Sequence, residues 1–192
     1  MQLFVTDLYD FNLSGYDDLI EDLKNVLLEQ EKNSKNTESY SLKGKTGWHS
    51  PDSLCSGDDE LSTHLKSILY TATKEYAKSI GSFLPPIQFC KIQCWAMIMR
   101  NGDYSTTHSH PGCKYSGVLY LKVPDNMPDG EGNLVFIDPR PGARSSVVWG
   151  SLIHREKPEQ GKGFVFPNWL EHYVECHYTD DVRISLAWNF DY

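Results

Sequence analysis

Residues 105–123 read Ser-Thr-Thr-His-Ser-His-Pro-Gly-Cys-Lys-Tyr-Ser-Gly-Val-Leu-Tyr-Leu-Lys-Val, and this stretch decides the fold that the sequence predicts. Both of its ends are typical of β-strands, and a proline-containing turn separates them. Side chains alternate between the two faces of a strand, so His108 and His110 would project from one face and could hold one ion together. Imidazole binds iron, zinc, copper and nickel. The stretch therefore predicts a β fold that carries a metal site.

Strand-like segments continue on both sides of this stretch, at the short spacing expected of a sandwich or barrel. Turns rich in glycine, proline, asparagine and aspartate separate them. The expected strands are residues 89–100, 105–110, 115–123, 133–137, 146–149, 163–166, 172–176 and 183–190. Eight short strands in succession predict a double-stranded β-helix, also called a jelly roll.

The residues before position 88 have a different pattern. Residues 16–30 and 58–80 repeat their apolar side chains every three or four positions and carry acidic residues in their first turns, which predicts two amphipathic helices. Residues 2–13 predict an opening strand or extended arm, and residues 32–47 a polar loop. We expect one domain over residues 1–192, in which an N-terminal helical support (1–87) packs on one sheet of a mainly β, jelly-roll core (88–192).

Composition excludes several classes of protein. The net charge of −8 disfavours a surface built to bind nucleic acid. No apolar run approaches the roughly 18 residues of a membrane helix, and the first residues do not have the pattern of a secretion signal. The five cysteines include no CxxC pair, which argues against a disulfide framework or a cysteine-based zinc site. We expect a cytoplasmic protein that does not bind a membrane.

A second group of polar residues lies far from the first histidines. His172 comes 62 residues after His110, at the start of another expected strand, and would be a third metal ligand. Arg183 and Ser185 follow, and they would share one face of the last strand. A guanidinium beside a hydroxyl is well matched to a carboxylate, because its planar fork can donate two parallel hydrogen bonds. The sequence thus predicts a metal site next to a binding site for an organic acid.

These residues together resemble the 2-oxoglutarate, Fe(II)-dependent oxygenases, and most closely their phage and bacterial branch. The resemblance covers residues 88–192. The motifs that carry it are His108-Ser109-His110, residues 116–121, Phe166-Pro167, His172, Arg183-Ile184-Ser185 and Trp188. It implies that His108 and His172 bind iron and that Arg183 and Ser185 bind the far carboxylate of 2-oxoglutarate. It also implies that Tyr120 adds a hydrogen bond to this cosubstrate.

The sequence departs from the pattern of that superfamily at His110, where its members carry aspartate or glutamate. One interpretation is a three-histidine iron site. The other is that a carboxylate arrives from elsewhere, and Asp138 is the best candidate. His110 would lie on the same strand as His108 and needs no further ordering to chelate, whereas Asp138 depends on how the strands align. We therefore expect His110 as the ligand, with Asp138 as the alternative.

The resemblance implies an oxygenase that uses Fe(II), 2-oxoglutarate and O₂, releases succinate and CO₂, and hydroxylates a small molecule, an amino acid or a peptide. Asp138, Arg140 and Trp188 are expected to line the substrate pocket or to support the ligands. Two other functions stay open on the residues alone. One is a cupin-like metalloenzyme that does not use 2-oxoglutarate, and the other is a non-catalytic jelly-roll binding module.

Overall fold

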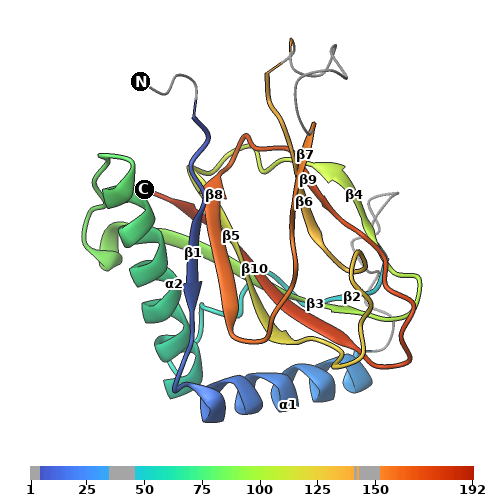
Figure 1. Cartoon of the computed structure of the whole chain (residues 1–192). Helices are drawn as coiled ribbons and strands as arrows, with labels where there is room; N and C mark the ends of the chain where they lie inside the picture. The colour runs from blue at the N-terminus through green and yellow to red at the C-terminus, as the bar shows by residue number, and fades with distance from the viewer. Residues whose placement is uncertain (1–4, 35–45, 141, 143–151) are drawn as a thin grey trace.

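The computed structural model describes residues 5–34, 46–140, 142 and 152–192, and in these residues two antiparallel sheets face each other with two helices outside (Figure 1). The larger sheet has the order β1-β8-β5-β10-β3-β2, and the smaller has the order β4-β9-β6-β7. The strands are β1 (Tyr9–Asn12), β2 (Trp48–His49), β3 (Lys91–Met99), β4 (Ser105–His108), β5 (Tyr115–Lys122), β6 (Leu134–Ile137), β7 (Ile153–Glu156), β8 (Lys162–Pro167), β9 (His172–Val174) and β10 (Arg183–Asp191). The helices are α1 (Asp17–Asn33), α2 (Glu60–Ser79) and the 3₁₀ turn η1 (Ile87–Phe89).

Strand β10 is the centre of the larger sheet, because it pairs along its whole length with β3 and over most of it with β5. Its side chains alternate between two apolar cores. Ile184, Leu186, Trp188 and Phe190 belong to the core beneath the helices. Arg183 and Ser185 lie on the opposite face, which looks toward the smaller sheet. The polar residues expected at the site are therefore carried on the inner face of the sandwich.

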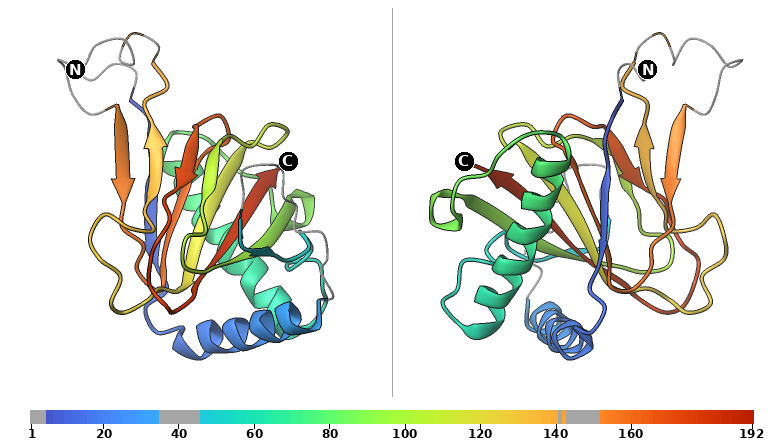
Figure 2. Two further views of the ribbon diagram at one scale, coloured as in Figure 1. Left: turned by 90° about the vertical axis from the view of Figure 1, so that its right-hand side faces the viewer. Right: turned by 60° about the vertical axis from the view of Figure 1, so that its left-hand side comes forward.

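Helices α1 and α2 pack on the outer face of the larger sheet (Figure 2). Trp188 is fully buried on this side, and its indole N–H donates to the hydroxyl of Thr73 in α2 at 3.3 Å. The ring lies over Gly117, where an added Cβ would come within 2.2 Å of it. Trp188 was expected to line the substrate pocket or to support the ligands, and its burial beneath α2 does not favour a place in that pocket. Alternation along β10 directs this side chain away from the inner face.

The mainly β fold with flanking helices is confirmed, and both predicted helices are present within a few residues of their expected limits. The strand expected over residues 146–149 lies outside the described residues. Two strands were not predicted. Strand β7 has the sequence Ile-His-Arg-Glu, which has no apolar alternation, and β2 is only two residues long. Since β1 and β2 join the larger sheet, the N-terminal segment contributes strands as well as helices.

Candidate metal centre

Three histidine rings converge at one end of the smaller sheet. His108 ends β4, His172 begins β9, and the two lie directly opposite each other in the antiparallel register. His110 follows two residues after His108. One ligand atom from each ring lies within 4.8 Å of the other two. Antiparallel pairing thus brings together residues that are more than 60 positions apart in the sequence.

Two of these rings are oriented by the backbone. The Nδ1 atom of His108 lies 2.8 Å from the carbonyl oxygen of Thr106, and that of His172 lies 2.8 Å from the carbonyl oxygen of Leu170. A carbonyl oxygen only accepts, so each Nδ1 carries the proton and donates it. The Nε2 atom of each ring then keeps its lone pair for a metal ion. Such carbonyl partners commonly fix the tautomer of metal-binding histidines.

His110 completes the group from outside the strand. Its backbone N–H donates to the carbonyl oxygen of Asn168 at 2.9 Å, and the Asn168 amide donates back to the His110 carbonyl oxygen at 3.4 Å. The Nε2 atoms of His110 and His172 are 3.2 Å apart. Two ligands about 2.1 Å from one metal ion, at an angle of about 90–109°, would be separated by roughly 3.0–3.4 Å. The spacing therefore fits shared coordination of one first-row metal ion.

Aromatic side chains lie against two of the three rings. The Phe166 ring meets His172 edge to face at 4.9 Å, and Phe136 lies 6.0 Å from His172 between ring centroids. Trp95 stacks on His110 at 5.9 Å. His172 itself is only 4% exposed. These contacts restrict the orientations of the His110 and His172 rings.

Arg183 lies on the inner face of β10 and is 1% exposed. Its Nη1 atom donates to the Ser185 hydroxyl at 3.3 Å, and its guanidinium carbon lies 4.9 Å from the centroid of the Tyr120 ring. Burial lowers the pKa of Arg183, and the neighbouring Tyr120 raises it. Burial raises the pKa of Tyr120, and the neighbouring Arg183 lowers it. The register places Tyr120 opposite Ser185. All three predicted cosubstrate residues are therefore neighbours.

The polar atoms of this second group are incompletely satisfied. Within the described residues, Nε and Nη2 of Arg183 and the hydroxyl of Tyr120 are buried without a hydrogen-bond partner. Buried polar groups are nearly always paired, and a buried charge is costly unless it is matched. Two N–H donors and a hydroxyl form a suitable set for a carboxylate. The residues present therefore fit an organic acid such as 2-oxoglutarate.

The histidines and Arg183 contact the same apolar core between the sheets. Phe166 contacts His172 and belongs to the same apolar cluster as Phe136, Tyr120 and Met99. Met99 in turn contacts the guanidinium of Arg183 through its sulfur at 3.5 Å. A continuous set of contacts between the sheets thus connects the metal-binding geometry with the carboxylate-binding geometry.

Asp138 and Arg140 follow the end of β6 and form an ion pair. The Asp138 carboxylate accepts from Nε of Arg140 at 3.0 Å and from Nη2 at 2.6 Å. Strand β6 pairs with β9, and Phe136 lies opposite His172 in that register, so this pair is near the histidines in the sheet. Asp138 is not a member of the convergent group of potential ligands. The geometry therefore favours His110 over Asp138.

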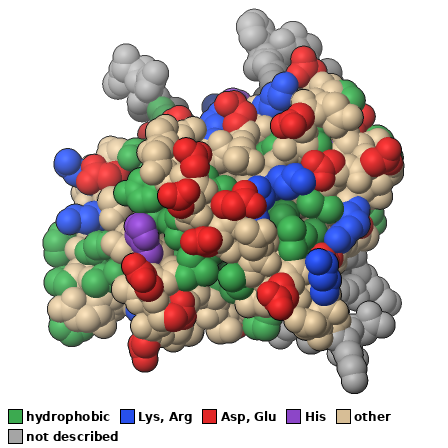
Figure 3. Space-filling view, turned by 90° about the horizontal axis from the view of Figure 1, so that it is seen from below, with side chains coloured by type: hydrophobic (Ala, Val, Ile, Leu, Met, Phe, Trp, Pro, Cys, Tyr) green, Lys and Arg blue, Asp and Glu red, His purple; other side chains and the backbone are tan. Residues whose placement is uncertain are grey.

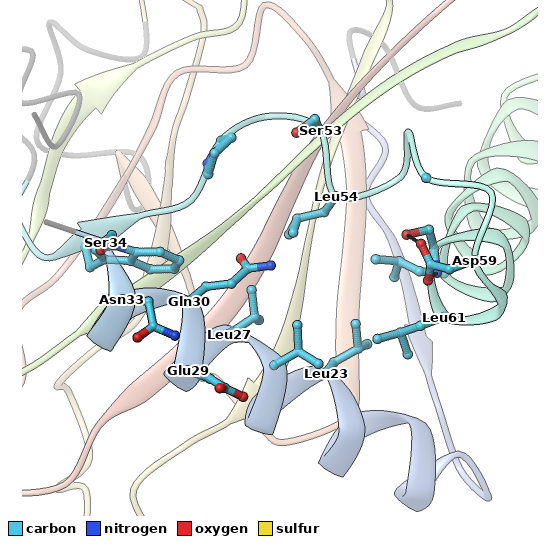
Figure 4. Close-up of a pocket in the computed structure, with 16 residues that line it drawn as sticks. Leu23, Leu27, Glu29, Gln30, Asn33, Ser34, Ser53, Leu54, Asp59 and Leu61 are labelled. Carbon is cyan, nitrogen blue, oxygen red and sulfur yellow. Dashed lines mark hydrogen bonds between the residues drawn. The ribbon is translucent and has the colours of Figure 1, made fainter. Parts of the chain in front are cut away.

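A separate hollow of about 810 Å³ lies between α1 and residues 48–65 (Figure 4). Leu23, Leu27, Leu54 and Leu61 line it, and none of the predicted site residues does.

The face that includes α1 carries acidic and apolar side chains interspersed with one another (Figure 3). Among the described residues, no helix combines the length and apolar character needed to cross a bilayer.

Trp95 lies beside the three histidines, and the sequence around it did not predict this position. A tryptophan in a strand is ordinarily a core residue, and only the register of β3 with β10 places this one on the inner face beside His110. The one signal in the sequence is that Trp95, Met97 and Met99 occupy alternate positions of the strand, which places all three on the same face.

Comparison with known structures identifies the fold. The structure matches a Pseudomonas putida prolyl-4-hydroxylase with a TM-score of 0.70 and 15% sequence identity, over 97% of this chain and 93% of that one. It matches a Trichoplax adhaerens prolyl hydroxylase, solved with a peptide fragment of hypoxia inducible factor, with a TM-score of 0.67 and 15% identity, over 99% and 86% of the two chains. It also matches HygX from Streptomyces hygroscopicus, solved with nickel and 2-oxoglutarate, with a TM-score of 0.65 and 11% identity, over 97% and 82%. The double-stranded β-helix is thereby confirmed.

Comparison of sequences gives a more specific result. No curated protein matches the chain. The model of a family described as putative 2OG-Fe(II) oxygenase matches residues 93–189, which is more than half of the chain. This span includes all three histidines, the buried arginine, strands β4 and β9, and most of β10. The chain belongs to the putative 2OG-Fe(II) oxygenase family, and its cofactors are accordingly Fe(II) and 2-oxoglutarate.

Proposed function

We propose that this protein is an Fe(II)- and 2-oxoglutarate-dependent hydroxylase in which His108, His110 and His172 bind the iron. Arg183 and Ser185, with Tyr120, would bind the far carboxylate of 2-oxoglutarate. The observation that carries the proposal is the presence of three convergent imidazoles and a buried, incompletely paired guanidinium in one inter-sheet core. Either feature alone occurs in proteins of many functions, but both are needed to hold a metal ion and a dicarboxylic acid side by side.

The residues of the chain would bind and orient these groups. When bound, Fe(II) and 2-oxoglutarate supply the activation of O₂, with formation of succinate and CO₂. A facial set of three protein ligands leaves positions open for the cosubstrate and oxygen. Three imidazoles are neutral, so Fe²⁺ with the oxoglutarate dianion would be near zero net charge. The buried Arg183 would form an ion pair with the far carboxylate.

The substrate would reach the site from the side of Asp138 and Arg140. Arg140 is well exposed, and its ion pair with Asp138 lies at the end of a strand that is paired with the strand of His172. An exposed guanidinium with a carboxylate beside it offers hydrogen bonds of both kinds to a polar substrate. We propose a small molecule, an amino acid or a peptide as the substrate class.

Binding of 2-oxoglutarate tests this proposal without knowledge of the substrate. The experiment is calorimetry of 2-oxoglutarate with Ni(II)-loaded wild type, with Arg183→Met, and with Arg155→Met as the control, since Arg155 forms an exposed ion pair with Glu175. We expect Arg183→Met to weaken binding at least about thirtyfold, as expected when one partner of a buried charge pair is removed. The control should bind like wild type, and thermal unfolding checks that each variant is folded.

The alternatives predict different results. Wild type that needs metal but ignores 2-oxoglutarate would indicate a cupin-like metalloenzyme of another kind. Tight zinc in a closed four-ligand site, or no metal at all, would indicate a non-catalytic binding module. Either result would reject the proposal. Succinate release, and a product heavier by one oxygen atom once a substrate is found, would then establish hydroxylation.

A further inference from the structure

We infer that Trp95 is a positioning residue for His110, and that its indole face holds this imidazole in the orientation needed for metal binding. The inference rests on the proposed metal site and assigns to it a residue outside the predicted set. The Trp95 and His110 rings stack with their centroids 5.9 Å apart and their planes at 25°.

The register of the larger sheet brings Trp95 to this position. Trp95 pairs with Ala187, midway along β10, and shares the inner face of β3 with Met97 and Met99. It is only partly buried, whereas the two methionines are buried within the inter-sheet core. Trp95 therefore lies at the border of that core, where the apolar layer meets the histidines.

The contacts that orient His110 differ from those of the other two histidines. His108 and His172 lie in paired strands, and each has its Nδ1 anchored by a carbonyl oxygen two residues earlier. His110 lies beyond the end of β4 and is anchored at its backbone by Asn168. Rotation of its ring about the side-chain torsions would move Nε2 away from the 3.2 Å spacing with His172. The flat face of an indole opposes that rotation.

The indole also suits the metal-loaded state electrostatically. An imidazole that binds a divalent cation becomes more positive. The face of a tryptophan ring attracts positive charge, and it does so most strongly where water is displaced. Trp95 would therefore stabilise metal-bound His110 more than free His110. This predicts an effect on metal affinity that is separate from any effect on the stability of the apoprotein.

The test compares Ni(II) binding in wild type, Trp95→Leu, Trp95→Phe and the control Trp169→Leu. Trp169 is half exposed and next to Asn168, so it is a tryptophan close to the site without a stacking role. Removing groups that support a metal ligand commonly costs ten- to hundredfold in affinity. We expect Trp95→Leu to bind Ni(II) about tenfold more weakly and Trp95→Phe, which keeps an aromatic face, within about threefold of wild type. The control should be unchanged.

Fluorescence gives a second measurement, because it reports whether Trp95 lies beside the bound metal ion. Ni(II) should quench the emission of wild type strongly, and the quenching should be mostly lost in Trp95→Phe although the metal still binds. This readout remains informative if Trp95→Leu does not fold, which thermal unfolding of the metal-free variants would show.

The outcomes separate this inference from the proposed function. If wild type binds Ni(II) and a folded Trp95→Leu binds it equally well, or if Trp95→Phe keeps the full quenching, Trp95 does not position His110 and the metal site stands. If wild type binds no metal, both the metal site and this inference are wrong.

Discussion

At the scale of single residues, the feature that sets this site apart is an imidazole at position 110. A carboxylate there would neutralise one charge of the metal ion, and an imidazole does not. The nearest charged residues described after β6, Asp138 and Arg140, are paired with each other. The metal ion would therefore rely on its bound cosubstrate for neutralisation. We therefore expect the affinities for metal and for 2-oxoglutarate to depend on each other.

Substitution at positions 110 and 138 tests which residue is the third ligand. We expect His110→Ala to weaken Ni(II) binding at least about a hundredfold, beyond the loss typical of a residue that only supports a ligand. His110→Asp should keep binding, because a carboxylate is also a ligand for such ions. Asp138→Ala should have little effect. Calorimetry with Ni(II) measures all three. Loss of binding in Asp138→Ala, with normal binding in His110→Ala, would assign the ligand to Asp138 instead.

At the scale of the elements, the contact between β5 and β10 fixes how α2 packs. The Trp188 ring fits against the larger sheet because Gly117 has no side chain, and its indole N–H reaches Thr73 of α2. The same strand carries Arg183 and Ser185 on its other face. A disturbance of the outer core would therefore reach the residues proposed to bind the carboxylate through β10.

Gly117→Ala should destabilise the protein without a change in charge or polarity. The new Cβ would lie 2.2 Å from the Trp188 ring, so the ring or the strand must shift, and overpacking of this kind costs about 1–3 kcal/mol. The measurement is the free energy of unfolding from urea denaturation. Trp188→Phe in the same background should recover part of the loss, because the smaller ring leaves room. If the effects of the two substitutions simply add, the clash is not the cause.

At the scale of the whole molecule, the proposed metal ion and 2-oxoglutarate would link the two sheets, which already share an apolar core. The histidines come from the smaller sheet and the segment that follows β4, while Arg183 comes from the larger sheet. A metal ion with 2-oxoglutarate would bridge the two. Ligands that bind only the folded chain stabilise it by mass action.

Ni(II) and 2-oxoglutarate together should therefore raise the stability of the folded protein. At a ligand concentration about 100 times Kd, we expect a gain of about 2.7 kcal/mol, which appears as a higher Tm. Addition of a chelator should reverse it. The double variant His108→Ala/His172→Ala should show no rise in Tm when Ni(II) and 2-oxoglutarate are added. Its Tm without these ligands is measured first for comparison. A full Ni(II) response in that variant would locate the metal elsewhere.

The sequence by itself determined the class of fold, most of the elements and the residue types of the site. Periodicity is a local property, so the helices at 17–33 and 60–79 and most of the strands could be predicted within a few residues of their observed limits. The resemblance of the motifs around the histidines and Arg183 to the 2-oxoglutarate, Fe(II)-dependent oxygenases also suggested an oxygenase. Strand β7 was not predicted because its side chains follow no apolar pattern. Its pairing with β6 is what makes it a strand.

Only the tertiary structure decided which of these residues meet. The convergence of His108, His110 and His172 and the stacking of Trp95 on His110 depend on strand register. Trp188 shows the same dependence, since alternation along β10 directs it to the helices while Arg183 faces the smaller sheet. A shift of register by one residue would reverse every such assignment. The local pattern of one strand does not show its register, because register depends on pairing with strands that lie far away in the sequence.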